Sequence, residues 1–91
     1  MCKYAVDAIL DVVAEQLEPL TLEEHSISRR YVGEATYSIL RRLWDLGYKE
    51  VSSQWLYRTL SLMYSVRSGV VWNSKRNTTV LVGYKLKQLV P

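Results

Sequence analysis

Two adjacent cations, Lys75 and Arg76, lie in a short polar segment between two runs of β-forming residues. The first run is Val70-Val71-Trp72 and the second begins at Thr78, so the polar residues 73–77 are typical of the turn of a β-hairpin. Charges at an exposed turn contribute little to stability. They are well placed, however, to bind an anionic partner, and the rest of the sequence must position them for it.

The charges are divided unequally between the two halves of the chain. Residues 1–45 carry five Lys or Arg and eight Asp or Glu, a net charge of −3. Residues 46–91 carry seven Lys or Arg and one acid, Glu50, a net charge of +6. A basic half-chain favours a polyanionic partner for that half.

The sequence offers little that could do catalysis or bind a metal. Its single cysteine, Cys2, and single histidine, His25, cannot build an internal disulfide or the usual four-ligand zinc site. There is no glycine-rich phosphate loop, and four of the nine acids, Asp7, Asp11, Glu15 and Glu18, fall in a solvated stripe of the first helix rather than forming a converging pair. We therefore expect no enzyme, no catalytic residue, no metal and no cofactor.

The N-terminal segment does not predict export or membrane insertion. Asp7, Asp11 and Glu15 interrupt its apolar run, which a signal peptide does not tolerate. No apolar stretch approaches the ~20 residues that span a bilayer. We expect an intracellular protein without a membrane partner, located in the cytoplasm, or in the host cytoplasm if the protein is viral.

The elements that must position the cations follow from the spacing of apolar residues. The 91 residues are enough for one domain, residues 1–91. Apolar side chains at helical spacing predict three helices, over about 4–18, 29–46 and 52–65. Runs of β-forming residues predict a hairpin over about 70–86. Pro19 ends the first helix, Gly47 follows the second, and Ser52 or Ser53 caps the third. This is an α+β chain with mostly helical content.

The stretch ILRRLWDLGYKEVSSQWLYRTLSLMYSVRSGVV carries a resemblance to a known family. Two helices joined by a very short glycine-containing turn are the helix-turn-helix arrangement. The LYRTL helix and its exit into Gly69-Val70-Val71 resemble winged helix-turn-helix domains, and the hairpin resembles their wing. The resemblance covers about residues 4–86. Among winged-helix proteins, the sequence pattern resembles that of small regulators of crenarchaea and their viruses. It implies a winged helix, that is, a three-helix bundle followed by a C-terminal hairpin wing.

The resemblance also implies that the helix over 52–65 enters the major groove of double-stranded DNA. Arg58 can bind guanine bidentately and Gln54 can pair with adenine. Ser53, Tyr57 and Ser61 share or flank the same polar stripe and can donate to phosphate oxygens. The expected function is sequence-specific DNA binding by a transcriptional regulator.

The wing tip, residues 73–77, is expected on the DNA backbone or in the minor groove. There Lys75 and Arg76 would neutralise phosphates. Further backbone contacts are expected from four other cations, Lys49, Arg67, Arg29 and Arg30.

A homodimer is expected, because one such module contacts little DNA and two-fold symmetry matches palindromic sites. Trp55 and Leu62 lie seven residues apart at the margin of the inward stripe. They are the candidate contacts between subunits, and the first helix is an alternative interface.

Three alternatives stay open at this point. The basic half could dock an acidic protein, which would make the chain a protein-interaction module. The tyrosines also suit RNA or a distorted duplex that is recognised by shape. Finally, residues 29–46 could hold the recognition helix, with Arg41 and Arg42 as the reading pair, although a hairpin directly after 52–65 favours the later helix.

Overall fold

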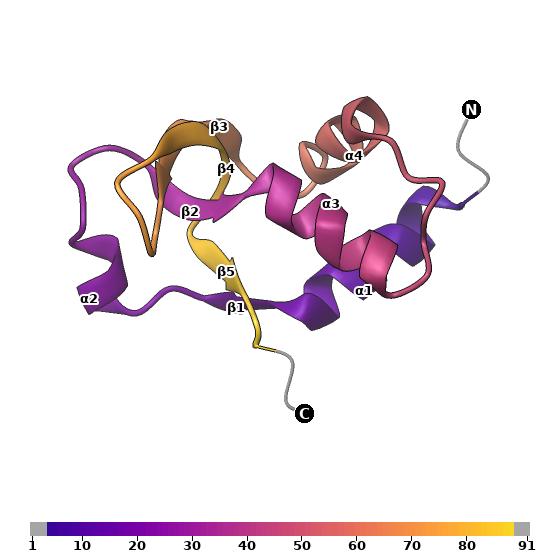
Figure 1. The fold of residues 1–91 in the computed structure, drawn as a ribbon, viewed down its shortest axis with the longest axis horizontal. Helices are drawn as coiled ribbons and strands as arrows, with labels where there is room; N and C mark the ends of the chain where they lie inside the picture. The colour runs from indigo at the N-terminus through magenta and orange to yellow at the C-terminus, as the bar shows by residue number, and fades with distance from the viewer. Residues whose placement is uncertain (1–3, 89–91) are drawn as a thin grey trace.

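The computed structural model describes residues 4–88 (Figure 1). This part of the chain forms four helices and five strands. In chain order they are α1 (Val6–Gln16), β1 (Leu17–Pro19), α2 (Leu22–His25), β2 (Val32–Ala35), α3 (Thr36–Asp45), α4 (Ser53–Leu60), β3 (Val66–Val71), β4 (Asn77–Val82) and β5 (Tyr84–Leu86). Figure 1 shows β2, β3, β4 and α2 towards one end of the molecule, with α1, α3 and α4 towards the other.

The strands form two separate sheets. β1 and β5 make a two-stranded antiparallel sheet in which Leu17 lies opposite Leu86. β3 and β4 form an antiparallel hairpin. β2 pairs with both hairpin strands, antiparallel to β4 and parallel to β3, and so closes the three strands into a small barrel.

Closure of this barrel depends on glycine at two positions where backbones touch. A Cβ atom at Gly33 would lie 1.9 Å from the carbonyl oxygen of Leu81. A Cβ atom at Gly69 would lie 2.3 Å from the carbonyl oxygen of Tyr31. Both distances are far shorter than van der Waals contact, so only a residue without a side chain fits either position.

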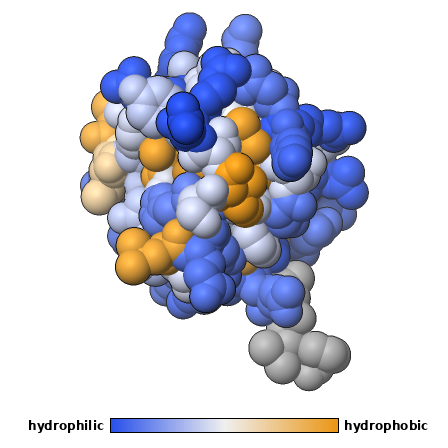
Figure 2. All heavy atoms as spheres, turned by 90° about the vertical axis from the view of Figure 1, so that its left-hand side faces the viewer, coloured by the Kyte–Doolittle hydropathy of each residue, from blue (hydrophilic) through white to orange (hydrophobic). Residues whose placement is uncertain are grey.

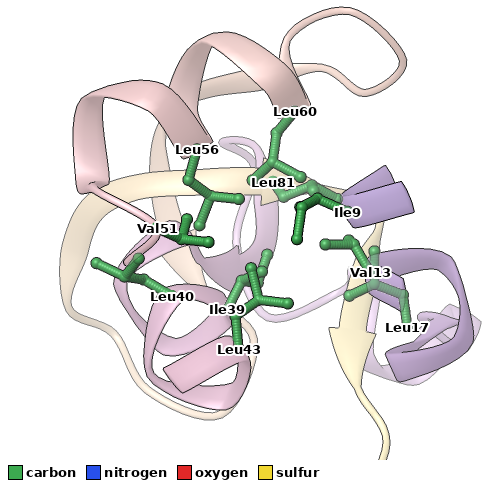
Figure 3. Packing of buried hydrophobic residues seen from close by; sticks show 10 residues of the cluster. All are labelled: Ile9, Val13, Leu17, Ile39, Leu40, Leu43, Val51, Leu56, Leu60 and Leu81. Carbon is green, nitrogen blue, oxygen red and sulfur yellow. The ribbon is translucent and has the colours of Figure 1, made fainter. Parts of the chain in front are cut away.

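One hydrophobic core joins the three longer helices to the barrel. Figure 3 shows its members, Ile9, Val13, Leu17, Ile39, Leu40, Leu43, Val51, Leu56, Leu60 and Leu81. Leu81 of β4 is completely buried, so the hairpin and the helices share the same core. Burial of apolar surface, worth about 25 cal/mol per Å², is the main term that holds such short elements together.

The connection between α3 and α4, residues 46–52, is a tight turn. Gly47 has a φ of +107°, a conformation that residues with side chains rarely adopt, and it follows the helix as the sequence predicted. The indole Nε1 of Trp44 donates a hydrogen bond of 2.9 Å to the carbonyl oxygen of Val51. These features fix the direction in which α4 leaves the turn.

The fold class predicted from the sequence, a winged helix built as a three-helix bundle with a C-terminal hairpin, is wrong. The structure is an α+β fold with two sheets, five strands and four helices within the described residues. One strand pair, β2 with β3, is parallel, which a simple C-terminal hairpin cannot provide.

The main error lies in the predicted helix over residues 29–46. Only Thr36–Asp45 is helical, while Val32–Ala35 forms β2 and residues 29–31 belong to the loop before it. The local spacing of apolar residues fits a helix, but pairing with two distant strands overrides it. The helix therefore begins seven residues later than predicted.

The other predicted bounds also differ. α1 ends at Gln16 rather than near 18, α4 ends at Leu60 rather than near 65, and the hairpin runs from Val66 to Val82 rather than over 70–86. Gly83, with a φ of +88°, turns the chain out of the hairpin, so that the last strand pairs with β1 instead. No helix within residues 4–88 has both the length and the apolar character needed to cross a membrane.

Candidate nucleic-acid interface

α4 turns an apolar face to the core and a polar face to solvent. Its start is capped by Ser52, whose Oγ accepts a hydrogen bond of 3.2 Å from the backbone N of Trp55. The buried face consists of Leu56, Thr59 and Leu60. The exposed face consists of Ser53, Gln54, Tyr57 and Arg58. The polar stripe predicted from the spacing is thus exposed along the whole helix.

These four side chains line one shallow groove, which we call the helix groove. Its other wall is made by Thr36, at the start of α3, and by Thr79 of β4. The structure therefore brings the two predicted base-reading residues, Gln54 and Arg58, next to two predicted phosphate donors, Ser53 and Tyr57.

A second groove, the hairpin groove, lies between the hairpin tip and the first turn of α3. The tip contributes Asn73, Ser74 and Arg76. The opposite wall includes Tyr37 and Ser38 of α3, and Glu34, Ala35, Val71 and Thr78 complete the lining. The tip is itself hydrogen-bonded, since the backbone N of Val71 donates to the carbonyl oxygen of Arg76 at 3.2 Å.

The two grooves adjoin each other. Thr36 lines the helix groove and its neighbour Tyr37 lines the hairpin groove. In the same way, Thr79 lines the first groove and Thr78 the second. One continuous surface therefore runs from the polar face of α4, across the start of α3, to the hairpin tip. We call it the α4–hairpin surface.

The cations of this surface are not neutralised within the protein. Arg58, Lys75 and Arg76 make no ion pair with any residue in the described part of the chain. All three are exposed. Unpaired guanidinium and ammonium groups attract an anion and can form charge-assisted hydrogen bonds with it.

Lys85 shows the opposite situation. Its Nζ lies 2.6 Å from Oε2 of Glu24 and 3.6 Å from Oε1 of Glu18. The hydrogen bond with Lys85 lowers the pKa of Glu24 to about 2, and the same bond raises the pKa of Lys85. The ammonium also lies 4.9 Å from the ring centroid of Trp72. This cation holds α2, β1 and β5 together and is not free to bind a ligand.

Glu34 is the acid at the bottom of the hairpin groove, and it is buried. Its Oε2 accepts one hydrogen bond from Nε1 of Trp72 and a second from the backbone N of Leu86, both of 3.1 Å. These bonds tie β2 to the end of β3 and to β5. We therefore assign Glu34 a structural part in the floor of the groove rather than a contact with a ligand.

The structure places the other predicted DNA contacts outside the two grooves. Lys75 belongs to the exposed hairpin tip but lines neither groove, and Lys49 lies in the exposed turn before α4. Ser61 follows the end of α4, where its Oγ donates to the carbonyl oxygen of Tyr57 at 2.8 Å. Arg29, Arg30 and Arg67 are exposed in the loop before β2 and near the start of β3.

The two predicted subunit contacts differ in exposure. Trp55 is half-buried and packs against the core. Leu62 is 70% exposed, and its neighbour Met63 is 68% exposed. An adjacent pair of exposed apolar side chains follows α4, whereas the tryptophan contributes mainly to the fold.

The sequence did not indicate the residues that α3 and β4 contribute to the site. Thr36, Tyr37 and Ser38 were placed inside a predicted helix, although they form the first turn of α3. Their run of three hydroxyl groups was the only local signal. Thr79 was placed in a strand, but nothing in the sequence indicated that this strand faces α4.

Comparison of this chain with models of protein families, with curated proteins and with solved structures finds no match.

Proposed function

We propose that this protein binds double-stranded DNA in a sequence-dependent way through the α4–hairpin surface, as a regulator of transcription. α4 would enter the major groove, and the hairpin tip would contact the backbone or the minor groove. This role implies a protein that works inside the cell.

One observation carries the proposal. The exposed polar face of α4 and the cationic hairpin tip belong to one continuous surface whose arginines have no acidic partner among the described residues. The size of α4 also fits, because an α-helix about 10–12 Å in diameter fills a major groove about 12 Å wide. Its eight residues span about 12 Å, enough for Gln54 and Arg58 to reach successive base pairs.

The side chains divide into two classes of contact. Arg58 and Gln54 have the donor patterns that read guanine and adenine. Ser53, Tyr57, Arg76 and Lys75 would bind phosphates, together with Thr36 and Tyr37 from α3. Phosphate contacts set the register of α4 on the duplex, and the base contacts then select the sequence.

We further propose that the protein acts as a homodimer, because two modules double the DNA contact and match a palindromic site. Leu62 and Met63 are the side chains best placed for this contact, since both are exposed and apolar. Sedimentation of the wild type and of Leu62→Ser tests it. A monomeric wild type would contradict the dimer without affecting the DNA surface.

The test of DNA binding is a fluorescence anisotropy titration with a random-sequence duplex at several salt concentrations. The protein is 38 Å long, which corresponds to about 11 base pairs at about 3.4 Å each, so a duplex of about twice that length suffices. Wild type is compared with Arg58→Ala/Arg76→Ala. The control, Arg41→Ala/Lys87→Ala, has the same net charge and removes two exposed cations that line neither groove.

Each phosphate contact contributes about 0.9 to the slope of log affinity against log salt. We expect Arg58→Ala/Arg76→Ala to lower the slope by about 0.9, because only Arg76 of the two is assigned to a phosphate, and the control to leave the slope near that of wild type. Equal binding by wild type and Arg58→Ala/Arg76→Ala would exclude the proposed surface. A larger loss of affinity in the control would instead favour α3, with Arg41, as the element that reads the bases. If the same titration with an RNA duplex showed tighter binding than with DNA, DNA would not be the preferred ligand.

A further inference from the structure

A second group of cations is associated with Tyr31, two by sequence and one by contact with its ring, and none of them lines either groove. Arg29 and Arg30 directly precede this tyrosine in the loop before β2. The guanidinium carbon of Arg67, in β3, lies 5.5 Å from the centroid of the Tyr31 ring. All three arginines are exposed, and Tyr31 is 53% exposed. We call this group the arginine cluster.

The cluster is partly preorganised and carries uncompensated charge. Arg67 is held by its stacking on Tyr31 and by a hydrogen bond of 3.0 Å from its Nε to Oγ of Ser65. This arrangement leaves the terminal nitrogens of its guanidinium without a hydrogen-bond partner among residues 4–88. None of the three arginines forms an ion pair with a described residue. Three guanidinium groups of this kind match the geometry of phosphate oxygens.

The register of the hairpin places the cluster on the face opposite the helix groove. Ser68 of β3 pairs with Thr79 of β4, and Thr79 lines the helix groove. Arg67 is the next residue along and pairs with Val80. Because successive side chains of a strand point to opposite faces, Arg67 points away from α4. Figure 2 shows the end of the molecule formed by α2 and the barrel, which is mostly hydrophilic with small apolar groups.

Arg67 also lies far from the hairpin tip. It is the second residue of β3, whereas the tip begins after Val71, the last residue of that strand. DNA has a persistence length of about 150 base pairs, so a duplex held along the α4–hairpin surface does not fold back over the base of the hairpin. Arg67 therefore does not face that duplex.

We propose that the arginine cluster binds the phosphate backbone of a second DNA duplex, so that one protein molecule bridges two duplexes. This inference rests on the proposed function of the α4–hairpin surface. Contacts through arginine to phosphate carry no sequence information. The second duplex would therefore be held regardless of its sequence, while α4 reads the first.

The test is a bridging assay on beads. One duplex is immobilised, protein is added, and the capture of a second, fluorescent duplex is measured for wild type, Arg30→Ala/Arg67→Ala and the charge-matched control Arg41→Ala/Lys87→Ala. Circular dichroism checks that each variant folds, and anisotropy measures binding to a single duplex. We expect wild type and the control to capture the second duplex. Arg30→Ala/Arg67→Ala should capture about tenfold less of the second duplex, while it still binds the single duplex.

Two outcomes would overturn the inference and leave the proposed function intact. The first is single-duplex binding by wild type without capture of the second duplex. The second is equal capture by wild type and Arg30→Ala/Arg67→Ala, because a homodimer would then bridge through its two helix grooves. Failure of the proposed function is recognised separately, when Arg58→Ala/Arg76→Ala binds a single duplex as tightly as wild type does.

Discussion

Replacing Gly33 by alanine should strongly destabilise the protein, because β2 lies in backbone contact with β4 at this position. The new Cβ would lie 1.9 Å from the carbonyl oxygen of Leu81, 2.7 Å from its carbonyl carbon and 3.0 Å from the Cα of Val82. All three obstacles are backbone atoms, so no side-chain rotation relieves the clash. The strands must separate by more than an ångström, which weakens the pairing between β2 and β4.

The magnitude follows from two opposing terms. Overpacking of a tight interior costs about 1–3 kcal/mol and more where the backbone must move. Alanine restricts the unfolded chain more than glycine does, which offsets about 0.4–1 kcal/mol. With the overpacking cost at the top of its range, we expect a net loss of about 2 kcal/mol from a stability of roughly 5–14 kcal/mol for a chain of this length. At about 4–8 °C per kcal/mol, the melting temperature should fall by at least about 8 °C.

Urea unfolding followed by circular dichroism measures this loss, and Gly47→Ala is the matched control. A Cβ at Gly47 meets no atom within 4 Å, so alanine there suffers only the strain of its φ of +107°, about 1–2 kcal/mol. The reasoning would be refuted if Gly33→Ala were no more destabilising than Gly47→Ala. That result would mean that β2 and β4 can separate at this position without a loss of unfolding free energy.

Two further predictions concern the supports of the fold. The folded-state pKa of Glu24, about 2, lies below its ordinary value of 4.5, so its ion pair with Lys85 stabilises the fold above pH 4.5 and is lost towards pH 2. Between pH 4.5 and pH 2, the free energy of unfolding should therefore fall less in Lys85→Met than in wild type, as measured by urea unfolding at each pH. The same pH dependence in both proteins would show that this ion pair does not stabilise the fold. Ser52→Ala should cost about 1 kcal/mol, because the cap of α4 is lost. The adjacent Ser53→Ala should cost less than about 0.5 kcal/mol, and equal losses in urea unfolding would show that Ser52 is not the cap.

The polar face of α4 could be predicted from the sequence because it depends on local features. Apolar residues at helical spacing and a capping serine lie within one short segment, so the spacing alone predicts that Gln54, Tyr57 and Arg58 share one face. The same holds for Gly47, whose left-handed conformation follows from its place after a helix.

The barrel could not be predicted, because its decisive contacts are distant in sequence. Val32-Gly33-Glu34-Ala35 fits a helix by spacing, and only its pairing with β3 and β4 makes it a strand. Gly33 lies inside the predicted helix 29–46, but glycine is required there because β2 touches the backbone of Leu81. The contributions of Thr36 and Tyr37 to the site were missed for the same reason, since β2 sets where α3 begins.

The pairing of β2 and β1 with the end of the chain has a consequence for synthesis on the ribosome. β4 and β5, the last two strands, complete both sheets, because β2 pairs with β4 and β1 pairs with β5. A nascent chain that lacks residues 77–86 can form its helices but neither completed sheet. Completion of both sheets should therefore depend on the segment 77–86, and until it emerges β1 lacks its partner strand and β2 can pair only with β3.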